Sequence, residues 1–212
     1  MNCLVITGGD APKAETLQRL AARCQLVIAA DSGVDTAASA LIIPDVAVGD
    51  FDSTAFSMAS ISSQGVSIMQ YPEDKDYTDT EIALSLAQEK GADYIILAGA
   101  GGGRLDHLLA VFTIFSRKFH PDEWQTKEDS IFYVPAGKTR HFRAAKQSFI
   151  SIFPLGERSV GMHSKNLKWE LDGLVWERGS FGISNRSVGS EFSIIAGSCP
   201  LLVITPSGTE SF

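Results

Sequence analysis

The chain has 212 residues, of which 44% are hydrophobic and 20% are charged, and this ordinary composition excludes disordered and fibrous proteins. That length is enough for one large domain or two small ones. The net charge of −7 at pH 7 argues against a protein whose partner is a nucleic acid.

The negative charge is concentrated in one part of the chain. Eight acidic residues and one base, Lys75, lie between Asp45 and Glu81, whereas the rest of the chain holds 17 acids and 17 bases. This stretch is either an acidic face in solvent or a place where cations are collected.

The sequence contains no pattern typical of a membrane span, a signal peptide or a disulfide framework. No apolar run approaches the roughly 20 residues that a membrane span needs, and Met1–Ile6 lacks the basic region and cleavage site of a signal peptide. Cys3, Cys24 and Cys199 are odd in number and widely spaced, which favours reduced thiols over a disulfide framework or a zinc site. We therefore expect a cytoplasmic protein without a membrane partner.

The first part of the chain alternates short apolar runs with helical patterns. The predicted strands are Cys3–Thr7, Leu26–Ala30, Val46–Val48 and Tyr94–Ala98, and the clearest predicted helices are Ala14–Arg23 and Leu105–Lys118. Apolar strands interleaved with helices indicate a mainly parallel sheet covered on both faces, a Rossmann-like α/β domain.

The pattern changes after the polar stretch Pro121–Asp129. The runs that follow are β-rich and show no helical period: Ile131–Val134, Phe149–Phe153, Leu167–Leu171, Phe192–Ile195 and Leu201–Thr205. Their spacing is typical of an all-β sandwich or barrel. The sequence thus predicts two domains, 1–128 and 129–212.

Acidic residues and glycines follow the predicted α/β strands. Asp31 ends one strand, Asp50 and Asp52 end another, and Gly99–Gly103 leads from a third to Arg104 and Asp106, while Asp10 could join them. In open α/β sheets ligands bind at this edge, outside the carboxyl ends of the strands. Their joint placement predicts a binding site there.

Asp50-Phe51-Asp52 has two interpretations. In an extended segment both carboxylates point the same way and could hold one Mg²⁺. Alternatively, Asp52 or Ser53 simply caps a helix that begins near Ala55.

The segment Lys75–Glu81 is more specific. Thr78 and Glu81 form a predicted capping box, which puts Asp79 in the first helical turn. The helix dipole favours a carboxylate there, but the crowding of acids around Lys75 also indicates a bound cation.

The Gly99–Gly103 loop joins a predicted strand to a predicted helix. Its glycines would let backbone N–H groups approach an anion, and Arg104 could hold phosphate oxygens through two bonds. The loop matches neither the Walker A nor the dinucleotide-binding pattern, and a flexible turn is the alternative. His107 is expected to be a packing residue at the helix start.

Taken together, these motifs resemble the thiamine pyrophosphokinase family. The resemblance rests on five segments in the family's order: Asp31-Ser32-Gly33, Gly49-Asp50-Phe51-Asp52-Ser53, Lys75-Asp76-Tyr77-Thr78-Asp79-Thr80-Glu81, Gly102-Gly103-Arg104-Leu105-Asp106-His107 and Gly182-Ile183-Ser184-Asn185. They spread over nearly the whole chain. The family's architecture, an α/β ATP-binding domain followed by a β-sandwich that binds thiamine, is similar to the two domains predicted above.

The resemblance implies an enzyme, a diphosphotransferase that moves the pyrophosphoryl group of ATP to the thiamine hydroxyl. It implies a homodimer with the active site at the subunit interface, Mg²⁺ on Asp50, Asp52 and Asp79, and the hydroxyl arriving at Asp76 and Asp79. The implied ATP-binding residues are Asp31, Ser32, Gly33, Lys75, Gly102, Gly103, Arg104 and Asp106, and the implied thiamine-binding residues are Asp76, Asp79, Ser184 and Asn185.

One departure from the family pattern concerns the aromatic partner of thiamine. Some relatives carry a tryptophan near the C-terminus, where this chain has Leu201-Leu202-Val203. Trp169 and Trp176 are expected to pack inside the β domain.

Three other functions remain open from the sequence. One is a diphosphokinase that acts on another alcohol such as a hydroxymethylpterin, and a second is a non-catalytic nucleotide- or thiamine-binding protein. Metal-dependent glycosyl transfer is less favoured, because the Lys75–Glu81 segment would then have no role.

Overall fold

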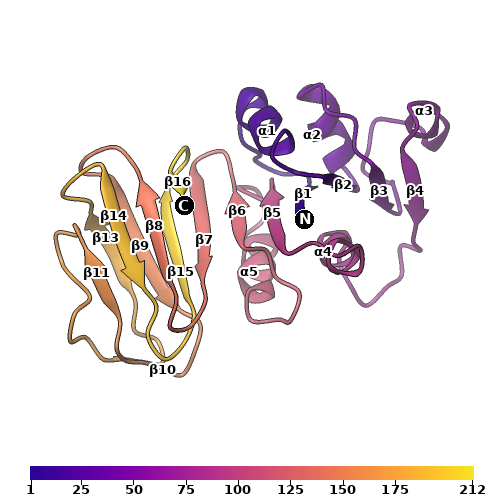
Figure 1. Ribbon diagram of the computed structural model, residues 1–212. Coiled ribbons are helices and arrows are strands. Elements are labelled where there is room, and N and C mark those ends of the chain that lie inside the picture. Colours follow the sequence, from indigo (N-terminus) through magenta and orange to yellow (C-terminus); the bar gives the residue numbers. More distant parts are fainter. The chain divides into compact units, whose positions relative to one another are not determined.

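The computed structural model describes residues 1–212, which form two compact units, Met1–Lys127 and Glu128–Phe212. The first is α/β and the second is all β (Figure 1). This confirms the predicted fold class. None of the helices combines the length and apolar character needed to cross a membrane.

The first unit is built on a parallel sheet in the order β4-β3-β2-β1-β5-β6. The strands are β1 Asn2–Ile6, β2 Leu26–Ala30, β3 Val46–Gly49, β4 Ser67–Gln70, β5 Tyr94–Ala98 and β6 Glu123–Gln125. The chain moves from β1 toward one edge and then returns to the other side of β1 with β5. The carboxyl ends of β1 and β5 therefore flank the point where the strand order reverses, which is where such sheets bind ligands.

Helices cover both faces of this sheet (Figure 1). They are α1 Ala14–Ala21, α2 Gly33–Ser39, α3 Met58–Ser63, α4 Asp79–Glu89 and α5 Leu105–Ile114. Leu17 and Leu20 of α1 pack with Leu4 and Ile6 of β1 in one core cluster. Two of these helices, α1 and α5, end earlier than the sequence predicts.

Strand β6 lies inside the polar stretch Pro121–Asp129, where the sequence predicts no strand. Glu123 and Gln125 are buried, and their polarity hides the strand from a hydrophobicity pattern. The Gln125 amide donates to Glu123 Oε1 at 2.6 Å, and the Tyr94 hydroxyl donates to Glu123 Oε2 at 2.9 Å. These bonds satisfy the buried carboxylate.

The second unit has antiparallel strands. Its sheets have the orders β13-β9-β15-β7 and β11-β14-β8-β16, with β10-β12 as a short ribbon. The strands are β7 Asp129–Val134, β8 Thr139–Arg143, β9 Phe149–Pro154, β10 Arg158–Ser159, β11 His163–Lys165, β12 Trp176–Glu177, β13 Gly182–Arg186, β14 Glu191–Ile195, β15 Leu201–Pro206 and β16 Glu210–Ser211.

The core of the second unit lies between its two larger sheets. Phe132 of β7 and Phe142 of β8 meet edge to face at 5.3 Å, and Phe142 stacks on Phe192 of β14 at 4.8 Å. The prediction of a strand over Leu167–Leu171 is wrong. Leu167 forms only an isolated bridge to Ser187, because the acidic side chains that follow fold this segment back on itself.

Candidate active site

A cavity of about 460 Å³ opens at the carboxyl edge of the parallel sheet in the first unit. It is lined by the loops that follow β1, β2 and β5, by the first turn of α4 and by one side of α5 from His107 to Ile114. Of the residues predicted to bind ATP, it is lined by Asp31, Ser32, Gly102, Gly103 and Arg104. Its volume is within the range of sites for small organic ligands.

The glycine loop has a backbone that side chains would disturb. Gly102 has φ of +62°, and a Cβ there would lie 2.3 Å from Asp10 Oδ2. The Asp10 N–H donates to Gly101 O at 2.7 Å, so the loops after β1 and β5 are bonded to each other. Gly103, with φ of +68°, has open space around it.

Arg104 and Asp106 form an exposed ion pair at the start of α5. Nε of Arg104 is 3.1 Å from Oδ1 of Asp106, and a second nitrogen is 2.5 Å from Oδ2. The hydrogen bond raises the pKa of Arg104 and lowers the pKa of Asp106. Arg104 lines the cavity, whereas Asp106 does not.

Two residues of the predicted motifs have other positions than expected. His107 is exposed and lines the cavity, so the expectation that it packs is wrong. Gly33 is buried at the start of α2, where a Cβ would lie 2.1 Å from Ile6 O, so it supports the sheet rather than lining the cavity.

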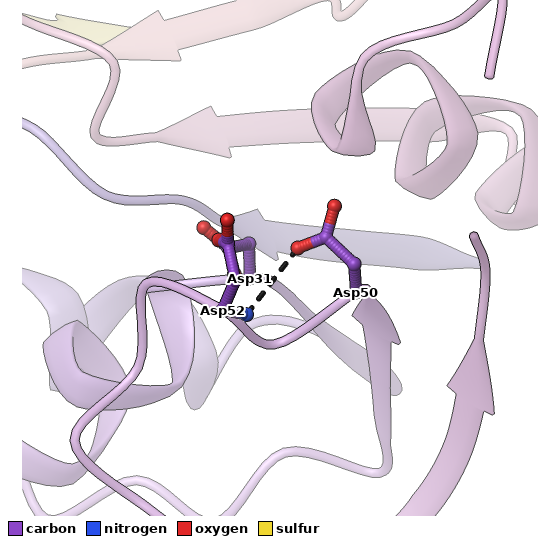
Figure 2. A group of neighbouring side chains, drawn as sticks. All are labelled: Asp31, Asp50 and Asp52. Atoms are coloured by element: carbon purple, nitrogen blue, oxygen red, sulfur yellow. Dashed lines mark hydrogen bonds between the residues drawn. The ribbon is translucent and has the colours of Figure 1, made fainter. Parts of the chain in front are cut away.

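Three carboxylates meet beside this cavity (Figure 2). Asp31, Asp50 and Asp52 each offer an oxygen within 4.8 Å of the others. The two aspartates of the Asp-x-Asp pair converge through a turn and not through an extended segment, because Phe51 has φ of +64°. The capping interpretation is wrong, since α3 begins at Met58 and is capped by Ser57.

Asp31 has features that a bound cation would explain. Its Oδ1 is buried and has no hydrogen-bond partner, although a buried carboxylate oxygen normally has one. Its φ of +47° is in the left-handed region that few residues other than glycine adopt. Three carboxylate oxygens form a donor set suited to Mg²⁺.

Lys75 lies between two acidic residues. Its Nζ is 3.0 Å from Asp50 Oδ2 and 3.1 Å from Asp79 Oδ1, and only 13% of its side chain is exposed. Burial lowers the pKa of Lys75, but its hydrogen bonds to Asp50 and Asp79 outweigh burial and raise the pKa overall. Asp79 is thus linked to Asp50 through Lys75 and is not one of the three grouped carboxylates.

The pKa values of the two aspartates paired with Lys75 are shifted in opposite directions. The hydrogen bond from Lys75 lowers the pKa of Asp50. Burial raises the pKa of Asp79, and the nearby Lys75 only partly opposes this. Asp79 is therefore the stronger proton acceptor of the two.

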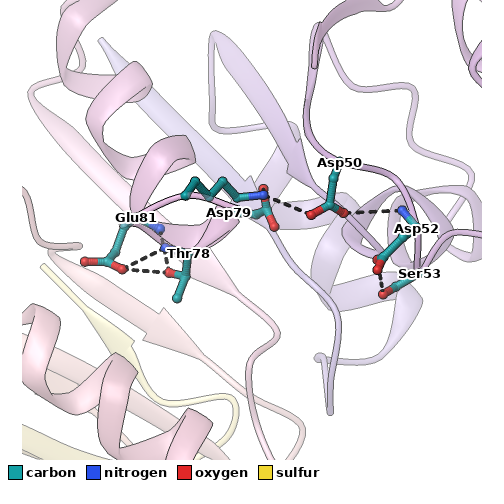
Figure 3. Close-up of polar contacts among 7 residues, drawn as sticks. Asp50, Asp52, Ser53, Thr78, Asp79 and Glu81 are labelled. Atoms are coloured by element: carbon teal, nitrogen blue, oxygen red, sulfur yellow. Dashed lines mark hydrogen bonds and ion pairs between the residues drawn. The ribbon is translucent and has the colours of Figure 1, made fainter. Parts of the chain in front are cut away.

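The predicted capping box is confirmed (Figure 3). Glu81 N donates to Thr78 Oγ1 at 3.3 Å, and Glu81 Oε2 accepts from Thr78 N at 3.0 Å. Asp79 is the first residue of α4 and lines the cavity with Thr78 and Thr80. Asp76 is exposed and is not part of the cavity lining.

In the second unit, Asn185 is buried and its amide is used within the fold. It accepts from Trp169 N at 3.1 Å and donates to Trp169 O at 2.7 Å. Ser184 is exposed, with φ of +58°, and its N–H donates to Ser151 Oγ at 3.3 Å. The amide of Asn185 is therefore occupied by the backbone of Trp169 and fixes the position of that residue.

Of the two tryptophans expected to pack, one does and one does not. Trp176 is part of the core, as predicted. Trp169 is 55% exposed, and Lys168 Nζ lies 4.3 Å from the centre of its ring. The indole of Trp169 therefore contacts Lys168 and solvent and is not part of the core.

Comparison with known proteins is consistent with both halves of this description. The model "Thiamin pyrophosphokinase, catalytic domain" matches residues 17–123, and "Thiamin pyrophosphokinase, vitamin B1 binding domain" matches residues 140–198. A thiamine pyrophosphokinase of Bacillus subtilis is 31% identical over 170 residues, which cover 78% of this chain and 79% of the relative.

Solved structures show the same fold. The crystal structure of thiamine pyrophosphokinase from Bacillus subtilis has a TM-score of 0.77 at 24% identity, over 98% of this chain and all of that one. Thiamin pyrophosphokinase from Candida albicans has a TM-score of 0.75 at 19% identity, over 97% and 88% of the two chains. With the two family models together covering most of its length, the chain belongs to the thiamin pyrophosphokinase family.

Proposed function

We propose that this protein is a Mg²⁺-dependent thiamine diphosphokinase, which transfers the pyrophosphoryl group of ATP to the thiamine hydroxyl and releases AMP. The observation that supports this most strongly is the group of Asp31, Asp50 and Asp52 beside a glycine-lined cavity. Such a cavity suits a triphosphate, because backbone N–H groups can approach its oxygens closely.

The two parts of the chain have separate roles in this proposal. Residues 1–128 bind ATP and carry the catalytic carboxylates, and residues 129–212 bind thiamine. The separate matches of the two family models to residues 17–123 and 140–198 support this division.

Asp50 and Asp52 are the residues that would hold Mg²⁺. Asp79 is the third ligand that the family resemblance implies, and Asp31 is the third carboxylate that the geometry adds. The unpartnered Oδ1 of Asp31 fits a cation at this point. When bound, Mg²⁺ supplies neutralisation of the triphosphate charge.

The ATP phosphates lie against Gly102 and Gly103. Arg104 binds their oxygens once its ion pair with Asp106 has broken. Asp31 and Ser32 bound the same cavity, and Gly33 and Lys75 support it from outside. These residues position the phosphorus for in-line attack, which is the main contribution of the protein to phosphoryl transfer.

Asp79, with Asp76 three residues before it in the chain, orients the thiamine hydroxyl and accepts its proton. The raised pKa of Asp79 favours this role, because a general base works best when its pKa approaches the operating pH. The acidic stretch attracts the thiamine cation. Ser184 and Asn185 belong to the thiamine-binding part of the site. Asn185 acts there by fixing the backbone of Trp169.

The protein acts as a homodimer in which each thiamine site uses both subunits. Light scattering should give twice the chain mass of 22.8 kDa. A fully active monomer would contradict the dimer without affecting the proposed reaction.

The reaction is tested by incubating the protein with ATP, Mg²⁺ and thiamine and measuring AMP and thiamine diphosphate. Both should form in equal amounts and neither without thiamine. AMP formation with hydroxymethylpterin in place of thiamine would indicate the other diphosphokinase. Nucleotide binding without AMP would indicate a binding protein and overturn the proposal.

A further inference from the structure

Arg117 lies just beyond α5 and contacts α4. Its backbone N–H donates to Ile114 O, the last residue of α5, at 2.8 Å, which places Arg117 in the turn that follows the helix. Its guanidinium NH1 donates to Oε1 of Glu81. The Glu81 side chain is 9% exposed and the Arg117 side chain 44%, so the bond reaches from a half-exposed cation to a buried carboxylate.

Glu81 divides its two oxygens between different tasks. Oε2 accepts from the backbone N–H and the hydroxyl of Thr78, at 3.0 and 2.9 Å, and so closes the start of α4. Oε1 accepts from Arg117. The capping box needs only the first oxygen, and the second would be a buried unpaired acceptor without Arg117.

The turn that Glu81 closes forms a wall of the cavity. Thr78, Asp79 and Thr80 all line it, whereas Arg117 does not. Thr80 Oγ1 lies 3.4 Å from Thr7 Oγ1 at the end of β1. The start of α4 is therefore held from two sides, by the sheet at Thr80 and by α5 at Glu81.

We propose that Arg117 is a positioning residue, which acts through Glu81 and Thr78 to hold Asp79 at the cavity wall, where Asp79 orients the thiamine hydroxyl for its attack on ATP. This inference rests on the proposed function for its kinetic consequence. A carboxylate that orients a nucleophile contributes through its placement, and small displacements slow the chemical step. In the proposed function, ATP binding depends mainly on the glycine loop, which is a separate part of the cavity lining.

The test compares Arg117→Met with wild type in steady-state kinetics. R117M should lower kcat about tenfold while KM for ATP stays within about twofold, because ground-state binding of the nucleotide is unaffected. Arg117→Lys, which can still donate to Oε1, should recover most of the lost kcat. The control is Arg158→Met, which removes an exposed arginine–glutamate pair in the second unit and should leave kcat and KM unchanged.

A second variant separates positioning from folding. Glu81→Gln keeps a residue that can form a capping box but removes the ion pair. It should lower kcat as much as R117M does, and the double variant should be no slower than either single one, because both changes break the same link. Wild-type kcat in folded E81Q or R117M, or additive losses in the double variant, would overturn the proposal.

Hydrogen exchange tests the link without any reaction. Backbone amides of residues 79–82 should exchange faster in R117M and E81Q than in wild type or R158M. Unchanged exchange there would refute the positioning role. Absence of AMP from wild-type protein would instead refute the proposed function and leave the exchange result standing.

Discussion

At the scale of single residues, the site depends on charges that are close but not equivalent. Asp50 faces both the carboxylate group with Asp31 and Asp52 and the ammonium of Lys75. Asp79 faces the same ammonium from the other side, with the start of α4 behind it. Lys75 thus lies between two kinds of carboxylate. Asp31, Asp50 and Asp52 form a group suited to binding a cation, whereas Asp79, with its raised pKa, is suited to accepting a proton.

Asp52→Asn should lower kcat at least about 10²-fold if this carboxylate ligates the metal in the transition state. AMP formation measures the loss, and Mg²⁺ titration of the remaining activity should require higher concentrations. Asp74→Asn is the matched control, because Asp74 is an exposed acid of the same stretch with no assigned role. Near-normal turnover in D52N would exclude Asp52 from the metal site.

Asn185→Ala should free the Trp169 segment, since both amide bonds to its backbone are lost. We expect a loss of about 1–3 kcal/mol of stability and a higher KM for thiamine with little change in KM for ATP. Trp169→Phe is the companion variant: it keeps the backbone bonds and should retain wild-type stability. An unchanged thiamine KM in both variants would remove this segment from the thiamine site.

At the scale of elements, neighbouring glycines of one loop have different tasks. Gly102 combines a positive φ with the close approach of Asp10, whereas Gly103 has only the positive φ. A methyl group at the first position must displace the Asp10 carboxylate, and at the second it meets no neighbouring atom. The structure therefore has no free space for a side chain at Gly102 but has space for one at Gly103.

Gly102→Ala should raise KM for ATP about tenfold, because the new methyl group displaces the Asp10 carboxylate, which lines the cavity. Gly103→Ala should cost about 1–2 kcal/mol of stability from backbone strain alone, with a smaller change in KM. Steady-state kinetics and thermal melting of the two variants side by side give the comparison. Equal KM values would mean that the contact with Asp10 has no role in shaping the site.

Sequence patterns predicted these elements unevenly. The capping box at Thr78 was predictable because it depends on residues three apart in one helix. The sequence also predicted that Asp31, Asp50 and Asp52 lie at one edge of the sheet. It did not predict that Asp31 joins the other two in one carboxylate group, because this requires β2 and β3 to be neighbours and Phe51 to adopt a left-handed turn. The exposure of Trp169 depends on a buried amide 16 residues away.

At the scale of the whole molecule, the two units carry separate cores, and the first contains Cys3, buried in β1, and Cys24, half-buried before β2. Burial, with smaller effects from Cys24 and Asp45, raises the pKa of Cys3 from 9.0 to about 12. Burial also raises the pKa of Cys24 to about 11. Both thiols stay neutral in the folded protein at pH values where an unfolded chain would ionise them.

The stability of the protein should therefore fall as the pH rises from 9 toward 12. A raised folded-state pKa stabilises the protein below the unfolded pKa, and this contribution is lost as the pH rises toward the folded one. Thermal melting of wild type and Cys3→Ala between pH 7.5 and 10.5 measures the effect. The difference between the two curves should shrink with pH, and a constant difference would contradict a buried neutral thiol.

The strand order of the first unit also affects how the protein folds during its synthesis. During synthesis β1 emerges first, yet its second neighbour, β5, is made some 90 residues later. The cavity needs both, together with α5, so a nascent chain has no nucleotide site until most of the first unit has left the ribosome. Such distant pairing slows folding. The first unit can bind ATP only after β1 and β5 have paired.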